Sequence, residues 1–353
     1  MLGRLEALVS FDTQNPPREL HAGAPLFAWL AEALGQGFDI ELIDHGLGRV
    51  AFLARRGDPQ ILFNVHLDTV PVLAGSRFPP LALHLDSNRA YGRGACDIKG
   101  AAACLLELAA TTDAPLALLF TTDEEGGEGC CVAEFIAAGR AAGYRQVIVA
   151  EPTGCLAESR HRGFLSARGL FRGVSGHSSE ARALADNAIH RMSRWCAGAL
   201  ALAEAADREG RRSCFNIGTV EGGVKSNVIA DQARIFWSAR LAPGESNEAF
   251  LARLMALEGG EEAEWTVSFA GPPLPTGEHG PEAAEAFARD FGLETGEGLD
   301  FWTEASLFGA AGIPALVLGP GHIAQAHAVD EWVETGQLET ALDIYGQLVH
   351  SDD

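Results

Sequence analysis

The pattern of hydrophobic positions along the chain predicts four buried strands, each followed by polar residues. The strands are short aliphatic runs at residues 61–66, 114–121, 146–150 and 315–318. Continuous apolar runs of this kind are typical of strands in a parallel sheet that is covered on both faces. Amphipathic segments at 1–10, 24–34 and 99–110 predict helices, and runs at 38–43 and 50–54 predict two further strands. We therefore expect an α/β fold with a mixed sheet flanked by helices.

A segment in the middle of the chain has a different rhythm, in which single helices alternate with strands in the order βαββαβ. The predicted elements are a strand at 162–174, a helix at 183–205, strands at 213–223 and 227–241, a helix at 248–258 and a strand at 263–271. This order is that of a ferredoxin-like domain. A chain of 353 residues has room for two domains. We expect a catalytic domain formed by 1–158 and 272–353, and an inserted lid or dimerisation domain at 159–271.

Charge and cysteine content exclude several classes of protein. The chain carries 48 acidic and 26 basic residues, a net charge of −22, which disfavours nucleic acid or an anionic membrane as a partner. No apolar run approaches the length of a membrane span or of a signal peptide's hydrophobic region. The seven cysteines are an odd number without a CxxC pair, so we expect them to be reduced in a cytoplasmic protein.

Acidic residues and histidines collect where the predicted strands end. They are His66 and Asp68 after the first strand, Asp97 before a helix, Asp123, Glu124 and Glu125 after the second strand, Glu151 after the third, and His322 and His327 after the fourth. In an open α/β sheet this edge binds ligands. Mixed nitrogen and oxygen donors suit zinc or cobalt, and about five donors suit two ions that share a carboxylate and promote hydrolysis.

Each of these signals also has a structural interpretation when it is taken alone. A His-x-Asp pair at a strand end is often only a hydrogen-bonded pair, and Asp97 has the position of a helix N-cap. An acidic run such as 123–125 is common at a helix N-terminus. Spacing does not distinguish Glu124 from Glu125, or His322 from His327. The convergence of all four strand ends is what favours a metal site.

Several motifs together resemble one known family. In chain order they are NVHLDTVP (64–71), YGRGACDIKG (91–100), TTDEEGG (121–127), VAEPT (149–153) and GPGHIAQAH (319–327), with HRGF (161–164), SGHSS (175–179) and FWTEASLFG (301–309) between them. In this order they resemble the di-zinc aminoacylase and deacetylase family of metallopeptidases. Within that family the motifs are most similar to those of the acetylornithine and N-acetylcitrulline deacetylases. The resemblance extends over nearly the whole chain.

The resemblance implies a role for each site residue. His66 and Glu151 would hold one metal ion, Glu125 and His327 the other, and Asp97 would bridge the two. Glu124 would be the general base and Asp68 the carboxylate behind His66. His177 would stabilise the oxyanion in a partner subunit's active site, although without the resemblance it reads as a surface loop residue.

The resemblance also implies a substrate. Asn227 and Arg240 would bind its carboxylate, and Glu304 is either a further pocket residue or a helix cap. The expected reaction is removal of the acetyl group from N-acetylcitrulline or N2-acetylornithine, small N-acyl amino acids of arginine biosynthesis. The expected cofactors are two divalent ions, with zinc favoured and cobalt able to substitute, in a homodimer. A succinyl-diaminopimelate desuccinylase or a carboxypeptidase on the same scaffold is the alternative, and the intact set of metal-binding residues argues against a non-catalytic binding module.

Overall fold

The structure, a computed structural model, describes residues 1–17, 20–126, 130–210, 214–275 and 281–350. The chain forms two compact units. The first contains Met1–Ser159, Pro281–Gly298 and Thr303–Asp353, and the second contains Arg160–Gly280 and Leu299–Trp302. The sequence places the return to the first unit at 272, whereas the second unit extends further. The main chain of Leu299 is hydrogen-bonded to Arg160 and Arg162, and the ring of Trp302 lies 4.9 Å from that of Phe269.

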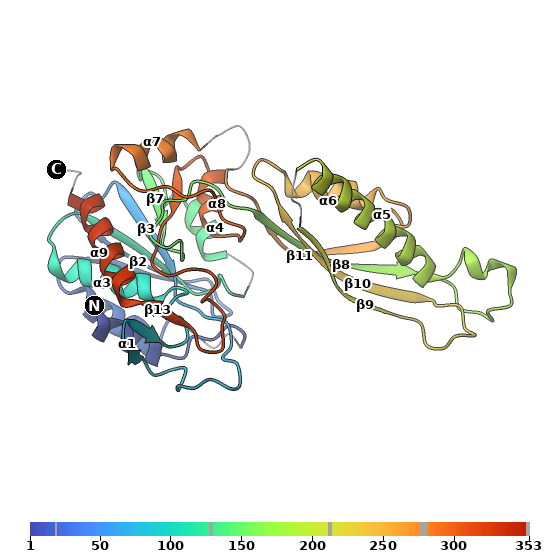
Figure 1. Cartoon of the computed structure of the whole chain (residues 1–353), viewed down its shortest axis with the longest axis horizontal. Coiled ribbons are helices and arrows are strands. Elements are labelled where there is room, and N and C mark those ends of the chain that lie inside the picture. The colour runs from blue at the N-terminus through green and yellow to red at the C-terminus, as the bar shows by residue number, and fades with distance from the viewer. Residues whose placement is uncertain (18–19, 127–129, 211–213, 276–280, 351–353) are drawn as a thin grey trace. The chain divides into compact units, whose positions relative to one another are not determined.

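The first unit is built on a six-stranded sheet with the strand order β1-β2-β6-β3-β7-β12. Strands β2, β3 and β7 of this sheet are labelled in Figure 1. Its strands are β1 (Asp39–Asp44), β2 (Val50–Arg56), β3 (Ile61–His66), β6 (Leu116–Thr121), β7 (Gln146–Val149) and β12 (Ala315–Val317). Strands β3, β6, β7 and β12 are neighbours and run parallel to one another. Strand β2 pairs antiparallel with both of its neighbours, β1 and β6. Every residue of these four strands is buried, which explains their continuous apolar runs. The predicted mixed α/β sheet is confirmed.

Helices flank this sheet. They are α1 (Leu2–Ser10), α2 (Pro25–Leu34), α3 (Lys99–Thr111), α4 (Cys130–Ala137), α7 (Glu282–Asp290), α8 (Ala305–Ala310) and α9 (Thr335–His350). Helix α3 contacts α1, α2 and α9, whereas α4 and α8 contact each other. No described helix is long and apolar enough to span a bilayer. The seven cysteines, all in the described part of the chain, are free of disulfides.

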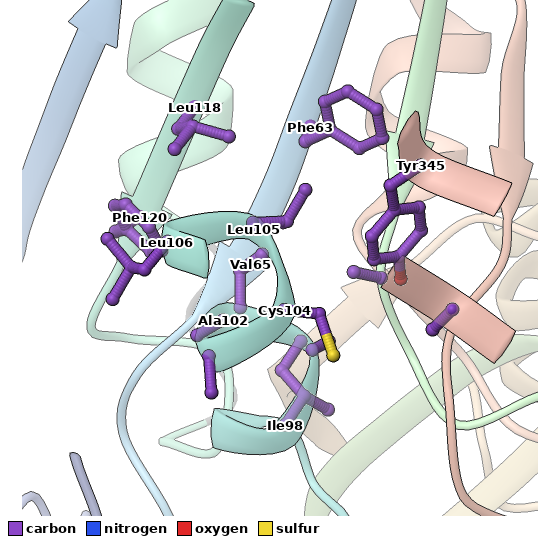
Figure 2. Packing of buried hydrophobic residues seen from close by; sticks show 14 of the residues in the cluster. Phe63, Val65, Ile98, Ala102, Cys104, Leu105, Leu106, Leu118, Phe120 and Tyr345 are labelled. Atoms are coloured by element: carbon purple, nitrogen blue, oxygen red, sulfur yellow. The ribbon is translucent and has the colours of Figure 1, made fainter. Parts of the chain in front are cut away.

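The core of the first unit lies between α3, the sheet and α9 (Figure 2). Leu105 and Leu106 of α3 are fully buried beside Phe63 of β3 and Phe120 of β6. On the side of α9, the ring of Tyr345 lies 5.3 Å from that of Phe63, and its hydroxyl donates to the carbonyl of Leu318 over 2.8 Å. This packing holds the parallel strands in register, so their carboxyl ends have fixed positions.

A small second sheet of the first unit joins two distant parts of the chain. Its strands are β4 (His84–Asp86), β5 (Arg89–Tyr91) and β13 (Trp332–Glu334), in the order β13-β5-β4. Trp332 pairs with Tyr91 and Glu334 with Arg89. The pairing places the segment before Asp97 beside the segment after His327.

The second unit has the predicted ferredoxin-like fold. Its elements are β8 (Gly163–Arg172), α5 (Ala188–Arg208), β9 (Cys214–Gly222), β10 (Gln232–Leu241), α6 (Asn247–Met255) and β11 (Glu264–Gly271). The antiparallel sheet has the order β11-β8-β10-β9. Alternate side chains of β10, among them Ile235 and Trp237, pack with Trp195 of α5 in an apolar core.

Two elements of this unit begin later than the sequence predicts. Helix α5 starts at Ala188, not 183, because Asn187 caps it by accepting the N–H of Ile189 and a short 3₁₀ helix occupies Ala181–Leu184. Strand β10 starts at Gln232, not 227, because a turn closes from Val228 N–H to the Lys225 carbonyl. Ser213, the first residue of the strand predicted at 213–223, and Gly127 of the TTDEEGG motif lie outside the described residues.

Candidate metal centre

His66 is the last residue of β3 and has one ring nitrogen committed to the protein. Its Nδ1 lies 2.9 Å from the main-chain oxygen of Asp68 and 3.6 Å from the nearer carboxylate oxygen of that residue. Because the carbonyl can only accept, Nδ1 donates, and Nε2 is the nitrogen that would offer its lone pair to a metal ion once it has lost its proton. The ring is 2 % exposed, so its orientation is fixed by the strand and by packing.

Asp97 joins two histidine–glutamate pairs through its two carboxylate oxygens. Oδ1 lies 3.0 Å from Nε2 of His66, and the same nitrogen lies 3.4 Å from Oε1 of Glu151. Oδ2 lies 3.2 Å from Nε2 of His327, and that nitrogen lies 3.1 Å from Oε1 of Glu125. We call the first group the first metal position (Asp97 Oδ1, His66, Glu151) and the second the second metal position (Asp97 Oδ2, Glu125, His327).

The donor atoms are close enough to share a cation. One donor atom each from His66, Asp97 and Glu125 lie within 4.8 Å of one another. Near these donors stand four carboxyl groups, counting Glu124, and two imidazoles. With all four carboxyls ionised, even two fully protonated imidazoles would leave the group with excess negative charge. Nitrogen and oxygen donors with this charge suit two divalent ions. The residues present therefore fit the pair of metals that the sequence predicts.

The pKa values of the three glutamates reflect this crowding. Burial raises the pKa of Glu125 to about 7, and the charge of Asp97 adds to the effect. Burial and Asp97 likewise raise the pKa of Glu151. Burial also raises the pKa of Glu124 well above its usual range; the neighbouring carboxylates add to this and His66 opposes it. A bound cation lowers such pKa values because it favours the ionised form.

The histidines and Asp97 shift in the opposite sense because they are paired. Hydrogen bonds with Asp97 and Glu125 raise the pKa of His327 to about 10. Burial alone would lower the pKa of His66, but the charge of Glu151 and hydrogen bonds with nearby carboxylates raise it well above its usual range. Burial alone would raise the pKa of Asp97, yet its hydrogen bonds to the two imidazoles hold it well below its usual range.

The carboxylate of Asp68 organises the turn after β6. It is completely buried and accepts the backbone N–H of Glu124 over 3.3 Å and that of Glu125 over 3.0 Å. Asn15 Nδ2 also donates to it, over 2.8 Å. Sequence reasoning missed Asn15, which lies in an N-terminal turn far from any motif. Asp68 thus touches His66 mainly through its main chain and the glutamate turn through its side chain.

The structure separates the two pairs of candidates that spacing left open. Of the two histidines, His327 reaches Asp97, whereas Nε2 of His322 lies 2.9 Å from the Gln337 amide. Of the two glutamates, Glu125 reaches His327. Glu124 and Glu125 are both partly exposed.

Glu304 lies behind the strand ends. It is 1 % exposed, and its Oε2 accepts from the Thr121 hydroxyl over 3.3 Å and, with the Asn64 amide nitrogen turned toward it, from Asn64 over 3.0 Å. Burial and the charge of Asp123 raise the pKa of Glu304 to about 8. It occupies the N-cap position of α8, but its side chain makes no capping hydrogen bond.

The other three candidates lie in the second unit. The main-chain oxygen of Asn227 accepts the N–H of Ser178 over 3.1 Å, which brings Asn227 beside His177. Both side chains are exposed, and Nδ1 of His177 lies 2.8 Å from the Ser179 hydroxyl. Arg240 lies near the C-terminal end of β10, with its guanidinium 4.1 Å from the centre of the Phe164 ring.

Known proteins resemble this chain in sequence. The sequence profile of Peptidase family M20/M25/M40 matches residues 62–351. An N-acetyl-L-citrulline deacetylase from Xanthomonas campestris is 42% identical over 360 residues, which cover 99% of this chain and 97% of that protein. An acetylornithine deacetylase from Edwardsiella ictaluri is 29% identical over 348 residues, which cover 92% and 89%.

Solved structures share the fold at lower sequence identity. The aminopeptidase PepT from Bacillus cereus superimposes with a TM-score of 0.74 at 20% identity, covering 99% of this chain and 96% of that one. The M20 family metallo-carboxypeptidase Sso-CP2 from Sulfolobus solfataricus gives a TM-score of 0.72 at 16% identity, with coverage of 99% and 98%.

Proposed function

Because this chain belongs to Peptidase family M20/M25/M40 and is a metal-dependent hydrolase of amide bonds, we propose that it removes the acetyl group from N-acetylcitrulline or N2-acetylornithine. The products are acetate and the free amino acid. The observation that carries the proposal is the double contact of Asp97, whose two oxygens each face a separate histidine–glutamate pair. The greater similarity to the citrulline enzyme supports N-acetylcitrulline as the preferred substrate.

His66, Asp97 and Glu151 would hold one divalent ion, and Asp97, Glu125 and His327 the other. Zinc is favoured by the mixed imidazole and carboxylate donors, and cobalt accepts the same set. Bound there, the two ions would lower the pKa of a water molecule and polarise the amide carbonyl.

Glu124 is the proposed proton carrier. Its backbone N–H is held by Asp68, beside the turn that carries Glu125. A Glu124 carboxylate oxygen takes the proton from water as the water oxygen bonds to the acetyl carbon. The C–N bond then breaks, and Glu124 delivers the same proton to the amine nitrogen. A raised pKa suits this second step, because the group must hold the proton before it gives it up.

The second unit supplies the proposed substrate contacts. The exposed ring of His177 is able to donate a hydrogen bond to the developing oxyanion, and Asn227 and Arg240 to the substrate carboxylate. For Glu304, complete burial supports a role in holding the strand ends, through Asn64 and Thr121, over direct contact with substrate.

We further propose that the enzyme is a homodimer that pairs through the second unit. Strand β9 is the last strand in the order of its sheet, and most of its side chains are exposed. An edge of this kind is a ready surface for pairing with a second chain. The cytoplasm is the proposed location, which the free cysteines support.

The experiment that tests the function compares initial rates on N-acetylcitrulline and N2-acetylornithine with zinc- and cobalt-loaded protein. We expect kcat/KM to be at least about tenfold higher for N-acetylcitrulline, which corresponds to about 1.4 kcal/mol of transition-state discrimination. A preference for N2-acetylornithine would instead assign the enzyme to the acetylornithine deacetylases. Metal-loaded protein that is inactive on both substrates, but active on succinyl-diaminopimelate or a peptide, would overturn the deacetylase assignment.

A further inference from the structure

A buried carboxylate outside the proposed ligand set holds the loop that presents Asp97. Glu331 is 3 % exposed and lies four residues after His327. Its Oε1 accepts the backbone N–H groups of Cys96 and Asp97, each over 3.0 Å. Its Oε2 accepts the backbone N–H of Gly94 over 3.0 Å. One side chain therefore binds three main-chain donors of a single turn.

Arg93 completes this arrangement and extends it to the loop of His327. Its Nη1 donates to Oε2 of Glu331 over 2.6 Å, and both side chains are almost fully buried. Its Nη2 donates to the carbonyl of Ala328 over 3.2 Å, directly after His327. The main chain adds a further link, from Gly92 N–H to the Glu331 carbonyl over 3.0 Å.

The loop that carries His327 needs such an anchor. His327 has a φ of 60°, a left-handed backbone conformation that is uncommon for a residue other than glycine. Residues held in this region persist when the surrounding structure fixes them. The imidazole is half exposed, so packing around the ring does little to hold it. The contacts of Glu331 and Arg93 fix the main chain on the carboxyl side of His327.

We propose that Glu331 is a positioning residue that sets the distance between Asp97 and His327 and thereby determines the affinity of the second metal position. The inference rests on the proposed function, because it takes Asp97, Glu125 and His327 as ligands. The first metal position depends on it less, because His66 ends β3 and Glu151 comes two residues after β7, and the core packing holds both strands.

The test measures the binding of two Co²⁺ ions to metal-free protein, followed by visible absorption and by metal analysis of the isolated complex. In Glu331→Gln an amide NH₂ replaces one acceptor oxygen and faces either Arg93 or backbone N–H groups. The side chain therefore loses its hydrogen bonds either with Arg93 or with part of the turn at 94–97. We expect the first ion to bind as in the wild type and the second to bind about 10- to 100-fold more weakly, the usual effect of losing a residue that orients a ligand. Excess Co²⁺ should restore kcat.

Asp330→Asn is the matched control. Asp330 is the neighbouring acidic residue and makes a similar set of bonds, to the Ser76 hydroxyl and to the backbone and side chain of Arg77, each over 2.8 Å. The loop that contains Ser76 and Arg77 carries no proposed ligand, so both ions should bind to this variant as they bind to the wild type.

A second variant guards against misfolding. Glu331→Gln leaves the guanidinium of Arg93 buried without its counter-charge, whereas Arg93→Met/Glu331→Gln removes that charge as well. We expect the double variant to fold, retain the first ion and bind the second weakly. Equal weakening of both ions, or unchanged binding of both, in folded variants would overturn the inference. A wild-type protein that binds fewer than two ions would instead overturn the proposed function, and the inference with it.

Discussion

The carboxylate of Asp68 accepts the backbone N–H of Glu125 over 3.0 Å, so the strand that ends in His66 also holds the turn after β6. The main-chain oxygen of the same residue accepts from His66 Nδ1 over 2.9 Å. A single residue thus orients one proposed ligand and places the turn that carries another proposed ligand, Glu125, and the proposed proton carrier, Glu124. The Asp68 side chain is needed mainly to place the turn, because His66 is oriented by the main-chain oxygen.

For Asp68→Asn we expect a fall in kcat of about 10- to 100-fold with little change in KM. The new NH₂ group opposes one of the N–H groups of Glu124 and Glu125, so the turn moves, whereas the carbonyl that orients His66 is unchanged. Steady-state kinetics at saturating metal measure the effect. Asp44→Asn, which alters an exposed carboxylate that accepts the N–H of Gly46, is the control. A normal kcat in Asp68→Asn would contradict this account.

Glu124→Gln should lose activity and keep its metal. The amide is nearly isosteric but cannot take up a proton, so kcat should fall about 10²- to 10⁴-fold. Metal analysis should still find two ions per chain, because Glu124 is not one of the proposed ligands. Glu134→Gln, at a glutamate that is 56% exposed and bonded to His45, is the matched control. Near-normal turnover in Glu124→Gln would exclude the proton-carrier role.

His177 should act across a dimer, which mixed dimers reveal. A His177→Ala chain and a Glu124→Gln chain, co-expressed with different tags, give mixed dimers in which one site has both a normal Glu124 and a normal His177 from the other chain. We expect about half of the wild-type activity from purified mixed dimers. Each variant alone should be nearly inactive. Mixed dimers without activity would show that His177 acts within its own chain, whereas a fully active His177→Ala protein would show that it has no catalytic role.

The sequence predicted those features that local pattern encodes. The strands β3, β6, β7 and β12 are apolar throughout, so their burial and their polar ends could be identified in the sequence without the structure. The ferredoxin-like order was equally visible. The helix starting at Ala188 was misplaced because the cap at Asn187 outweighs the helical pattern of the preceding residues.

The remaining features depend on contacts between distant segments. That His327, and not His322, lies beside Asp97 depends on the left-handed backbone of His327 and on the hydrogen bonds of Glu331. These bonds join Glu331 to residues 93–97, which lie 234–238 positions earlier in the sequence. No spacing rule contains that information. The pairing of β5 with β13 likewise joins three-residue strands that are too short to show a pattern.

Glu304 makes the stability of the first unit depend on pH in a way that a glutamine should remove. With a folded-state pKa of about 8, its carboxyl keeps its proton in the folded protein, whereas in the unfolded chain it ionises near its ordinary value of about 4.3. Between these values the unfolded state binds fewer protons, so the free energy of unfolding falls as pH rises, by up to about 1.4 kcal/mol per pH unit.

Glu304→Gln has no proton to lose, so its free energy of unfolding should fall less than that of the wild type between pH 5 and 8. The stability of the variant relative to the wild type should therefore rise across that interval and level off above it. Urea unfolding with chelator present, at several pH values, measures the difference. Glu339→Gln, at an exposed site, should follow the wild-type curve. If Glu304→Gln and the wild type lost stability in parallel as pH rises, Glu304 would be ionised in the folded protein, and its contacts with Asn64 and Thr121 would be those of a buried anion.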